Sequence, residues 1–590
     1  MSPERPVTKA QQHTISSGHQ LATEAGFEIL ERGGNAVDAG VAAGIALGVL
    51  HSDLVNVAGV APIIIRMANT GKVITIDGLG TWPRAASVET FEKQYGGRVP
   101  EGLLRTVVPA APASWITALE KFGTLTFGDV ASYAIKYARD GFPIFQVMAE
   151  FLSNNEAKYR RYPENARIFL PNGRSPQVGE TFVQKDLAKS LQYMVDQEAA
   201  AGGGREDGLR AAYDAFYRGD IAKTICDYHR DNGGWMVMED MADYRVRFEE
   251  PLKVKFADSD IYCCGPWSQG VSLAQAFAML EGAKSELIRF GHNSSDYIHY
   301  ITETLKLVFA DRERYVTDPL FHDVPTNEML AADYLESRAG LIDSAKAWPE
   351  MPPAGDPRAK APLIADVMHH STELREGGDA HATKPQDQVP AGGPSSADTS
   401  YVCVIDADGN MFSATPSDTS ADTEVIPGTG LCPSSRGSQS RGVSGSINAL
   451  APGKRPRLTP NPAMALKDGK PYMAFGTPGG DVQIQAMVQV FLNATCFGMD
   501  IQQAVEAPRF ASYSFPSSFA PNDYFPGLLM LEKRLGEETG ADLASRGHKI
   551  DWWADWTWKA GGVCAIQADI ENDTLYAGAD PRRAAYALGR

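Results

Sequence analysis

Residues 398–415 read Asp398-Thr-Ser-Tyr-Val-Cys-Val-Ile-Asp406, Ala407-Asp-Gly-Asn410 and Met411-Phe-Ser-Ala-Thr415. Two apolar runs on either side of an Asp/Gly/Asn turn are typical of a β-hairpin of buried strands. The stretch before it, 373–397, is polar, nearly devoid of apolar side chains and rich in glycine and proline. That composition predicts a flexible loop or linker. A buried strand therefore begins abruptly near Thr399.

The position of Thr399 suggests a chemical role. A threonine hydroxyl is a poor nucleophile and needs an adjacent base. If the backbone is cut before Thr399, the new α-amine lies within reach of the hydroxyl of the same residue. An α-amine titrates at about 7.7–8.0 in peptides, so it can act as a base at neutral pH. Threonine is also a common strand former, and the residue pattern alone leaves both interpretations open.

A second hairpin follows further along the chain. Apolar runs at Ala463–Leu466 and Tyr472–Phe475 flank Asp468-Gly469, and they lead through Gly476-Thr-Pro-Gly-Gly480 into an apolar helix at Val482–Phe497. Two glycines before a helix let the backbone approach a ligand and offer free N–H groups, as an oxyanion hole requires. A tight strand-to-helix turn is the alternative explanation for Gly479 and Gly480.

The N-terminal half is mainly helical by its apolar spacing. Helices are expected at 18–32 and 36–50, and a hairpin at Ile63–Arg66 and Val73–Ile76. The pattern from Ala113 to about Leu341 is mostly helical, including a long helix at 299–314. No internal repeat is present.

Composition excludes several classes of protein. The 590 residues carry a formal net charge of −18, which disfavours binding to nucleic acid. Seven cysteines do not make a disulfide scaffold. The N-terminus shows no apolar signal segment, and the apolar zone 39–65 is interrupted before it reaches the ~20 residues that a membrane span needs. These features lead us to expect a cytoplasmic protein.

Other catalytic motifs are incomplete. Gly78-Leu-Gly80 lacks the third glycine of a dinucleotide loop. Gly442-Val-Ser-Gly-Ser446 has the wrong spacing for a nucleophile elbow. His369 and His370 are adjacent and lack the spacing of metal ligands. The sequence therefore predicts no metal site.

Several short segments, in order along nearly the whole chain, form one pattern. They are Gly33-Gly-Asn-Ala-Val-Asp38, Tyr137-Ala-Arg-Asp-Gly-Phe142, Phe309-Ala-Asp-Arg312, Asp398–Asp406 with Asp408-Gly-Asn410, Pro452-Gly-Lys-Arg455, Thr477-Pro-Gly-Gly480, Glu506-Ala-Pro-Arg-Phe510 and Gly578-Ala-Asp-Pro-Arg582. The ordered set resembles the γ-glutamyltranspeptidase family of N-terminal-nucleophile hydrolases.

The resemblance implies an α+β fold, a four-layer αββα sandwich. It implies self-cleavage between Asp398 and Thr399, giving a large subunit (1–398) and a small subunit (399–590) that share one domain. Thr399 would attack an amide carbonyl with its own α-amine as base, Gly479 and Gly480 would hold the oxyanion, and Ser417 would hydrogen-bond the threonine. No metal or organic cofactor is implied, and a homodimer of the two-subunit unit is left open.

The sequence departs from the γ-glutamyl enzymes where they bind the donor. Leu79 stands at the position of the arginine that clamps the substrate α-carboxylate, and Cys432-Pro-Ser-Ser-Arg-Gly-Ser-Gln439 replaces the acidic pair that holds the α-ammonium. The family's Ser-Ser pair is replaced around Thr459-Pro-Asn-Pro462. Arg436 and Gly479-Gly-Asp-x-Gln483 look like the amidohydrolase-like branch, which includes oxamate amidohydrolases.

These departures define the expected substrate contacts. Arg436 could clamp a carboxylate, because a guanidinium matches it bidentately; a plain loop arginine is the alternative. Leu79, Thr419 and Asp481 are the other expected contacts. The leading interpretation is a self-processing amidohydrolase acting on a small non-γ-glutamyl amide or N-acyl compound. A γ-glutamyl hydrolase or transpeptidase, and a catalytically silent binding or scaffold relative, remain as alternatives.

Overall fold

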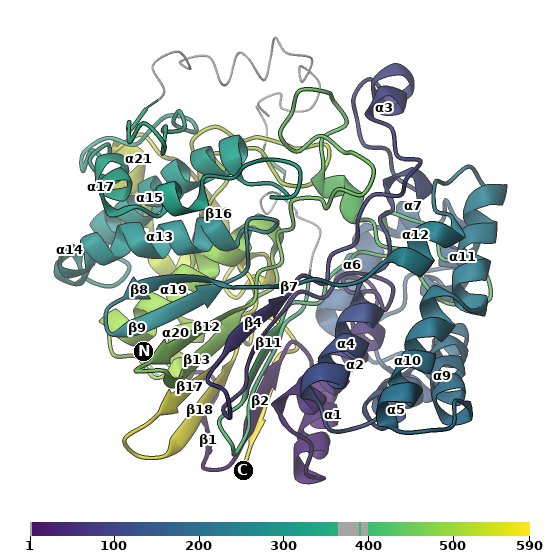
Figure 1. The fold of residues 1–590 in the computed structure, drawn as a ribbon. Coiled ribbons are helices and arrows are strands. Elements are labelled where there is room, and N and C mark those ends of the chain that lie inside the picture. Colours follow the sequence, from purple (N-terminus) through teal and green to yellow (C-terminus); the bar gives the residue numbers. More distant parts are fainter. Residues whose placement is uncertain (1–2, 364–388, 391–393, 395–398) are drawn as a thin grey trace.

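Two stacked seven-stranded sheets form the centre of the molecule, with helices on both outer faces (Figure 1). The computed structural model describes residues 3–363, 389–390, 394 and 399–590. The predicted loop at 373–397 falls largely outside the described residues, and so do His369, His370 and Asp398.

Sheet I has the strand order β1-β18-β17-β13-β12-β9-β8. Its strands are β1 (Thr8–Ala10), β18 (Thr574–Ala579), β17 (Cys564–Asp569), β13 (Lys470–Gly476), β12 (Ala463–Lys467), β9 (Ser259–Cys263) and β8 (Leu252–Phe256). Neighbouring strands are antiparallel throughout.

Sheet II has the strand order β19-β2-β10-β11-β3-β4-β7, also antiparallel. Its strands are β19 (Tyr586–Gly589), β2 (Thr14–Ser17), β10 (Val402–Ile405), β11 (Met411–Ala414), β3 (Ile63–Arg66), β4 (Val73–Ile76) and β7 (Phe248–Glu249). Both sheets therefore mix strands from before and after residue 399.

Helices of the N-terminal half cover the outer face of sheet II. They are α1 (Gln20–Glu31), α2 (Ala36–Leu50), α4 (Ala111–Phe122), α5 (Phe127–Asp140), α9 (Lys185–Ala200) and α10 (Arg205–Tyr217). Against this layer lie α6 (Gln146–Asn154), α7 (Glu156–Tyr159), α8 (Pro163–Phe169), α11 (Asp220–Asp231) and α12 (Met238–Asp243), with the small sheet of β5 (Phe142–Pro143) and β6 (Thr181–Phe182). The helix α3 (Val88–Tyr95) projects beyond it and packs through Phe91 against Trp82. The helix α2 is buried along its whole length, and an Asn35–Asp38 capping box fixes its start.

The outer face of sheet I is covered by a second helical layer. It contains α13 (Gly270–Gly282), α14 (Lys284–Phe290), α15 (Ser295–Tyr315), α16 (Thr326–Met329), α17 (Ala332–Ala339), α19 (Gln483–Cys496), α20 (Ile501–Glu506) and α21 (Glu537–Ser545). Beside it lies a three-stranded sheet of β14 (Phe510–Ser512), β15 (Leu528–Glu532) and β16 (Lys549–Trp553).

Three apolar clusters correspond to the three interfaces of the sandwich. Val404 and Phe412 of sheet II pack with the α1–α10 layer, and Phe475 of sheet I packs with the α13–α19 layer. Cys403 and Met464 face each other's sheets in the cluster between them. Successive strand residues thus enter different layers, as strand geometry requires, and the predicted αββα sandwich is confirmed.

The predicted hairpins and the helix at 36–50 are present within one or two residues. The expectation of a mostly helical stretch from Ala113 to Leu341 was incomplete, because the β8–β9 hairpin interrupts it and joins sheet I. Among the described residues, no helix has both the length and the apolar character to cross a membrane.

Candidate active site

Thr399 lies just before β10. The pairing between β10 and β11 continues there, past the ends of the two strands. Thr399 and Ser417 are antiparallel bridge partners, and the Ser417 backbone N–H donates to the Val60 carbonyl (3.0 Å). The side chains of Thr399 and Ser417 are fully buried. Val60, from far earlier in the chain, therefore helps to fix the backbone around the two hydroxyls.

A directional chain of hydrogen bonds ends at the Thr399 hydroxyl. Thr399 Oγ1 lies 2.7 Å from Ser417 Oγ, so the predicted contact is present. Arg436 Nη2 donates to Ser417 Oγ. Because a guanidinium can only donate, Ser417 accepts from Arg436 and keeps its own proton available for Thr399. The Arg436 charge therefore polarises the Ser417 hydroxyl, which can donate its proton to the Thr399 oxygen.

Arg436 is held in a buried setting at the start of the 3-10 turn η2 (Arg436–Gln439). Its Nε lies 3.8 Å from Asp418 Oδ2, and its guanidinium lies over the Phe519 ring, 5.4 Å from the centroid. Asp418 accepts hydrogen bonds from the Ser434 hydroxyl (2.6 Å) and from the N–H and hydroxyl of Ser435 (3.0 and 2.6 Å). Burial raises the pKa of Asp418 and the Arg436 charge opposes that shift, so the two residues belong to one electrostatic unit.

The glycine turn between β13 and α19 lies beside the same hydroxyl. Gln483, the first residue of α19, points its Nε2 toward Thr399 Oγ1 at 3.5 Å. Gly479 has φ 124° and Gly480 has φ 56°, and a 3-10 turn η3 (Gly480–Val482) follows. Both backbones lie in the left-handed region that glycine tolerates best. The turn is therefore specified by its glycines.

Asp481 is oriented toward the protein. Its carboxylate accepts from Arg312 Nη1 (2.5 Å), from the Ser518 hydroxyl (2.6 Å) and from the Ser518 N–H (2.8 Å). These contacts anchor η3 to α15 and suit a positioning role better than a substrate contact. Thr419, a second expected contact, is 3% exposed, and its Oγ1 accepts from the Ala421 N–H (3.2 Å).

Leu79 lies in a small buried apolar cluster with Val60, Cys264, Trp267 and Leu458. Its backbone carbonyl accepts from the Tyr244 hydroxyl (3.2 Å). The side chain offers no charge at this position, and its predicted role as a substrate contact stays a prediction.

Gln483, Asp418 and Arg312 are residues near the site that the sequence analysis did not single out. Gln483 and Arg312 lie inside sequence motifs that the family resemblance uses, and those motifs could have pointed to them. Asp418 follows Ser417 directly, and its link to Arg436 could not be read from spacing. Asp398, the other side of the predicted cleavage site, lies outside the described residues.

A cavity of about 610 Å³ opens next to the segment that carries Arg436. Its lining includes Arg98, Arg105 and Arg441, with Glu101 as the acidic counterpart. The Arg105 carbonyl lies against Gly437, directly after Arg436. Arg105 is paired with Asp422 (3.0 Å) and Arg441 with Glu313 (3.2 Å), so carboxylates already balance most of the positive charge beside this cavity.

Comparison with known proteins gives a consistent result. The sequence profile of the gamma-glutamyltranspeptidase family matches residues 22–589. The acylase ACY 1 proenzyme of Pseudomonas sp. (strain SE83) is 32% identical over 551 residues, covering 91% of this chain and 87% of that protein. The glutathione hydrolase-like YwrD proenzyme of Bacillus subtilis (strain 168) is 29% identical over 579 residues, 98% of each chain. The crystal structure of cephalosporin acylase from Bacillus halodurans matches with a TM-score of 0.83 at 25% identity, covering 100% of this chain and 98% of the other.

Proposed function

Because the chain belongs to the gamma-glutamyltranspeptidase family, we propose that it is an N-terminal-threonine amidohydrolase that removes a carboxylate-bearing acyl group from a small amide. The broader class is given by the family and its relatives: the protein is a self-processing amide hydrolase or acyltransferase, made as one precursor of two subunits. The proposal concerns the nucleophile, the cleavage position and the substrate.

Processing takes place between Asp398 and Thr399. In the continuous chain the nitrogen of Thr399 is an amide and cannot act as a base. Cleavage converts it into an α-amine beside the hydroxyl of the same residue, with a pKa of about 7.7–8.0 in peptides. Residues 1–398 and 399–590 then remain together, because both sheets contain strands from each part.

The observation that carries the proposal is the donor chain from Arg436 through Ser417 to Thr399. Since Thr399 Oγ1 accepts a hydrogen bond from Ser417, its own proton is left for the α-amine to take. The oxygen attacks the amide carbonyl, and the developing negative charge is received by the N–H groups of Gly479 and Gly480. The leaving amine takes the proton from the α-ammonium, and water then releases the acyl group from Thr399.

The carboxylate preference rests on Arg436 more than on the lining of the neighbouring cavity. Arg436 touches Ser417, so an acyl group bound to Thr399 extends within reach of the guanidinium. Of the arginines that line the adjoining cavity, Arg105 and Arg441 are paired with Asp422 and Glu313. The preference for an acyl chain that ends in an anion therefore depends mainly on Arg436.

A γ-glutamyl hydrolase is the second candidate, favoured by the similarity over 98% of the chain to the glutathione hydrolase-like protein. The replacement of the family's acidic pair by the segment 432–439 argues against it, because a γ-glutamyl donor carries an α-ammonium group that needs a partner.

A panel of amides tests the proposal. Glutaryl, oxamate, neutral acyl and γ-glutamyl amides are compared by kcat/KM on the processed protein, with Thr399→Ala as the blank. Highest activity on a non-γ-glutamyl acid amide supports the proposal. Highest activity on the γ-glutamyl amide would favour the second candidate, and no turnover of any amide would contradict both.

A further inference from the structure

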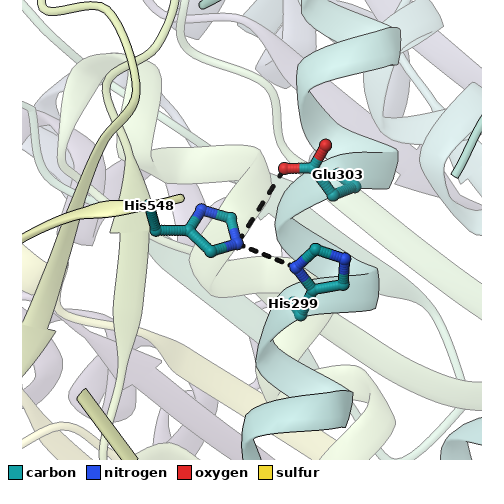
Figure 2. Close-up of side chains that lie close together, drawn as sticks. All are labelled: His299, Glu303 and His548. Atoms are coloured by element: carbon teal, nitrogen blue, oxygen red, sulfur yellow. Dashed lines mark hydrogen bonds and ion pairs between the residues drawn. The ribbon is translucent and has the colours of Figure 1, made fainter. Parts of the chain in front are cut away.

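A cluster of three metal-ligand side chains lies on the far side of sheet I from the helices α1 and α2, outside the site described above (Figures 1 and 2). His299 and Glu303 belong to α15 and are four residues apart, so they share one helix face. His548 directly precedes β16 and points toward them. All three side chains are buried, with residue exposures of 1%, 0% and 3%.

The distances between the donor atoms are close to those found around a bound Zn²⁺ ion. His299 Nδ1 and His548 Nε2 lie 2.9 Å apart, and His548 Nε2 and Glu303 Oε1 lie 4.0 Å apart. A tetrahedral Zn²⁺ with bonds of about 2.0–2.2 Å spaces its ligand atoms about 3.3–3.5 Å apart. These two distances bracket that value, and all three donor atoms lie within 4.8 Å of one another, so small side-chain shifts would bring them to the spacing that the ion requires.

The surroundings orient two of the three groups. His299 Nε2 donates to the Asp343 carbonyl (2.8 Å), which can only accept. In the neutral ring this contact leaves the lone pair on Nδ1, which faces the other two groups. Glu303 Oε2 accepts from the Trp348 N–H (2.9 Å), which fixes the carboxylate with Oε1 toward the histidines. Such outer contacts are typical of metal-binding histidines and carboxylates.

The hydrogen bonds of the empty cluster follow from the same tautomer. Because His299 Nδ1 carries the lone pair, His548 Nε2 must be the donor between the two rings. His548 Nδ1 is then a buried acceptor with no hydrogen-bond partner among the described residues. A metal ion bound through Nε2 would replace the contact between the rings and move the ring proton to Nδ1, so this atom lacks a partner in the empty and in the occupied cluster alike.

Lys306 opposes the binding of a metal ion here. Its buried ammonium lies 2.8 Å from Glu303 Oε1 and donates to the Trp348 carbonyl (2.7 Å). It already balances the Glu303 charge, so a divalent ion would share Glu303 with a cation. The competition predicts a site whose affinity is limited by Lys306, and it supplies a variant that should bind more tightly.

We propose that His299, Glu303 and His548 bind one Zn²⁺ ion, with a fourth position for water. Two histidines and one carboxylate are a common ligand set for Zn²⁺. The Asp343 carbonyl that accepts from His299 belongs to the exposed segment 343–346, so the cluster lies close below the protein surface. The site itself is independent of the proposed function. Where Thr399 is released by cleavage, the ion would also join the two subunits, since His548 lies after residue 399 and the other two ligands lie before it.

The test is a zinc titration of the full, tag-free protein after treatment with chelator, against a chromophoric competitor. We expect one equivalent of Zn²⁺ per chain, and a Kd raised at least about tenfold in His299→Gln and in His548→Gln. His229→Gln is the matched control, a buried histidine on α11, and should bind as wild type does. Thr399→Ala should also bind as wild type does, which separates this site from processing.

A variant that binds zinc more tightly than wild type must be folded, so it tests the site without the ambiguity of a loss of binding. Lys306→Met keeps the length of the side chain and removes the competing charge, so its Kd should fall at least about tenfold. Cobalt substitution should give the intense visible bands of a tetrahedral site in wild type and in Lys306→Met. Absence of stoichiometric zinc in wild type would overturn the proposal. So would equal affinities of wild type and His548→Gln, or a Lys306→Met variant that binds no more tightly.

Discussion

The hydroxyl oxygens of Thr399 and Ser417 lie 2.7 Å apart, although 18 positions separate the two residues in the chain. The contact depends on the register of β10 and β11, whose pairing continues to a bridge between Thr399 and Ser417. A slip of one residue would turn one side chain to the other face of the sheet. Strand pairing therefore sets the distance on which the proposed chemistry depends.

Thr399→Ala should give one uncut, folded chain without amidase activity, because a single hydroxyl serves both the cleavage and the turnover. Wild type should show two bands of about 43 and 21 kDa on a denaturing gel, at the chain's mean residue mass. Thr399→Ser keeps the hydroxyl and should retain some processing. Two bands from the alanine variant would remove Thr399 from the cleavage step.

Ser417→Ala should lower kcat about 10- to 150-fold, because a hydrogen bond to a group that becomes charged is worth about 1.5–3 kcal/mol. The measurement is steady-state kinetics on processed protein. Ser16→Ala is the matched control, since the buried Ser16 hydroxyl bonds the Gly578 carbonyl on another part of the sheets. If both variants lose activity equally, the effect belongs to the fold and not to the Thr399 contact.

Arg436→Met should change specificity as well as rate. The variant loses the donor to Ser417 for every substrate, so all rates fall. If the guanidinium also binds the acyl carboxylate, the preference for an acid amide over a neutral one of equal length should fall at least about tenfold more. The measurement is the ratio of kcat/KM for the acid amide to kcat/KM for the neutral amide, in wild type and in the variant. An unchanged ratio would restrict Arg436 to positioning Ser417.

Gly479→Ala should reduce kcat while leaving a folded protein. An alanine at φ 124° is strained by about 1–3 kcal/mol, and relief of that strain turns the N–H groups away from the oxyanion. Gly498→Ala provides the comparison, because Gly498 also has positive φ (62°) and a methyl group added there would meet no atom within 4 Å. We expect similar losses of thermal stability and a loss of activity only at Gly479. Equal activities would argue for a plain turn.

A γ-glutamyl anilide should be hydrolysed about 10- to 150-fold less efficiently than the matching glutaryl anilide, because its α-ammonium group lacks the acidic partner that the γ-glutamyl enzymes provide, at ~1.5–3 kcal/mol. Leu79→Arg should not restore this activity. The new charge would enter the apolar cluster of Val60, Trp267 and Leu458, and the site for the ammonium group would still be absent. Comparable kcat/KM values for the two donors would instead show that another residue binds the α-ammonium group.

The sequence predicts those helices and strands whose defining residues lie close together in the chain. The hairpins at 63–76 and 402–414 have apolar runs around clear turns, and α2 has its Asn35–Asp38 cap. The strand β2 reads Thr-Ile-Ser-Ser and carries little strand signal. It is buried because β10 and β19 flank it, and those partners lie hundreds of positions away.

The same distinction holds for the candidate site. Thr399 and the Gly479–Gly480 pair are recognisable in short motifs, and Ser417 by its place in the family pattern. The contact of Arg312 with Asp481 joins residues 169 positions apart and exists only because α15 crosses behind the glycine turn. The His299–Glu303 spacing was visible on a predicted helix, but His548 joins it only through the packing of β16.

Because β2 pairs with β10 and β19, which are synthesised much later, processing depends on how much of the chain has been made. The ribosome makes Thr14–Ser17 early, but β10 follows much later and β19 (Tyr586–Gly589) later still. Until β19 emerges, sheet II has an open edge beside the strand that leads from Thr399. We expect a nascent chain stalled before Tyr586 to remain in one piece, and self-cleavage to begin only after β19 has left the ribosome and paired with β2. Cleaved product from stalled chains would show that a partial sheet is sufficient.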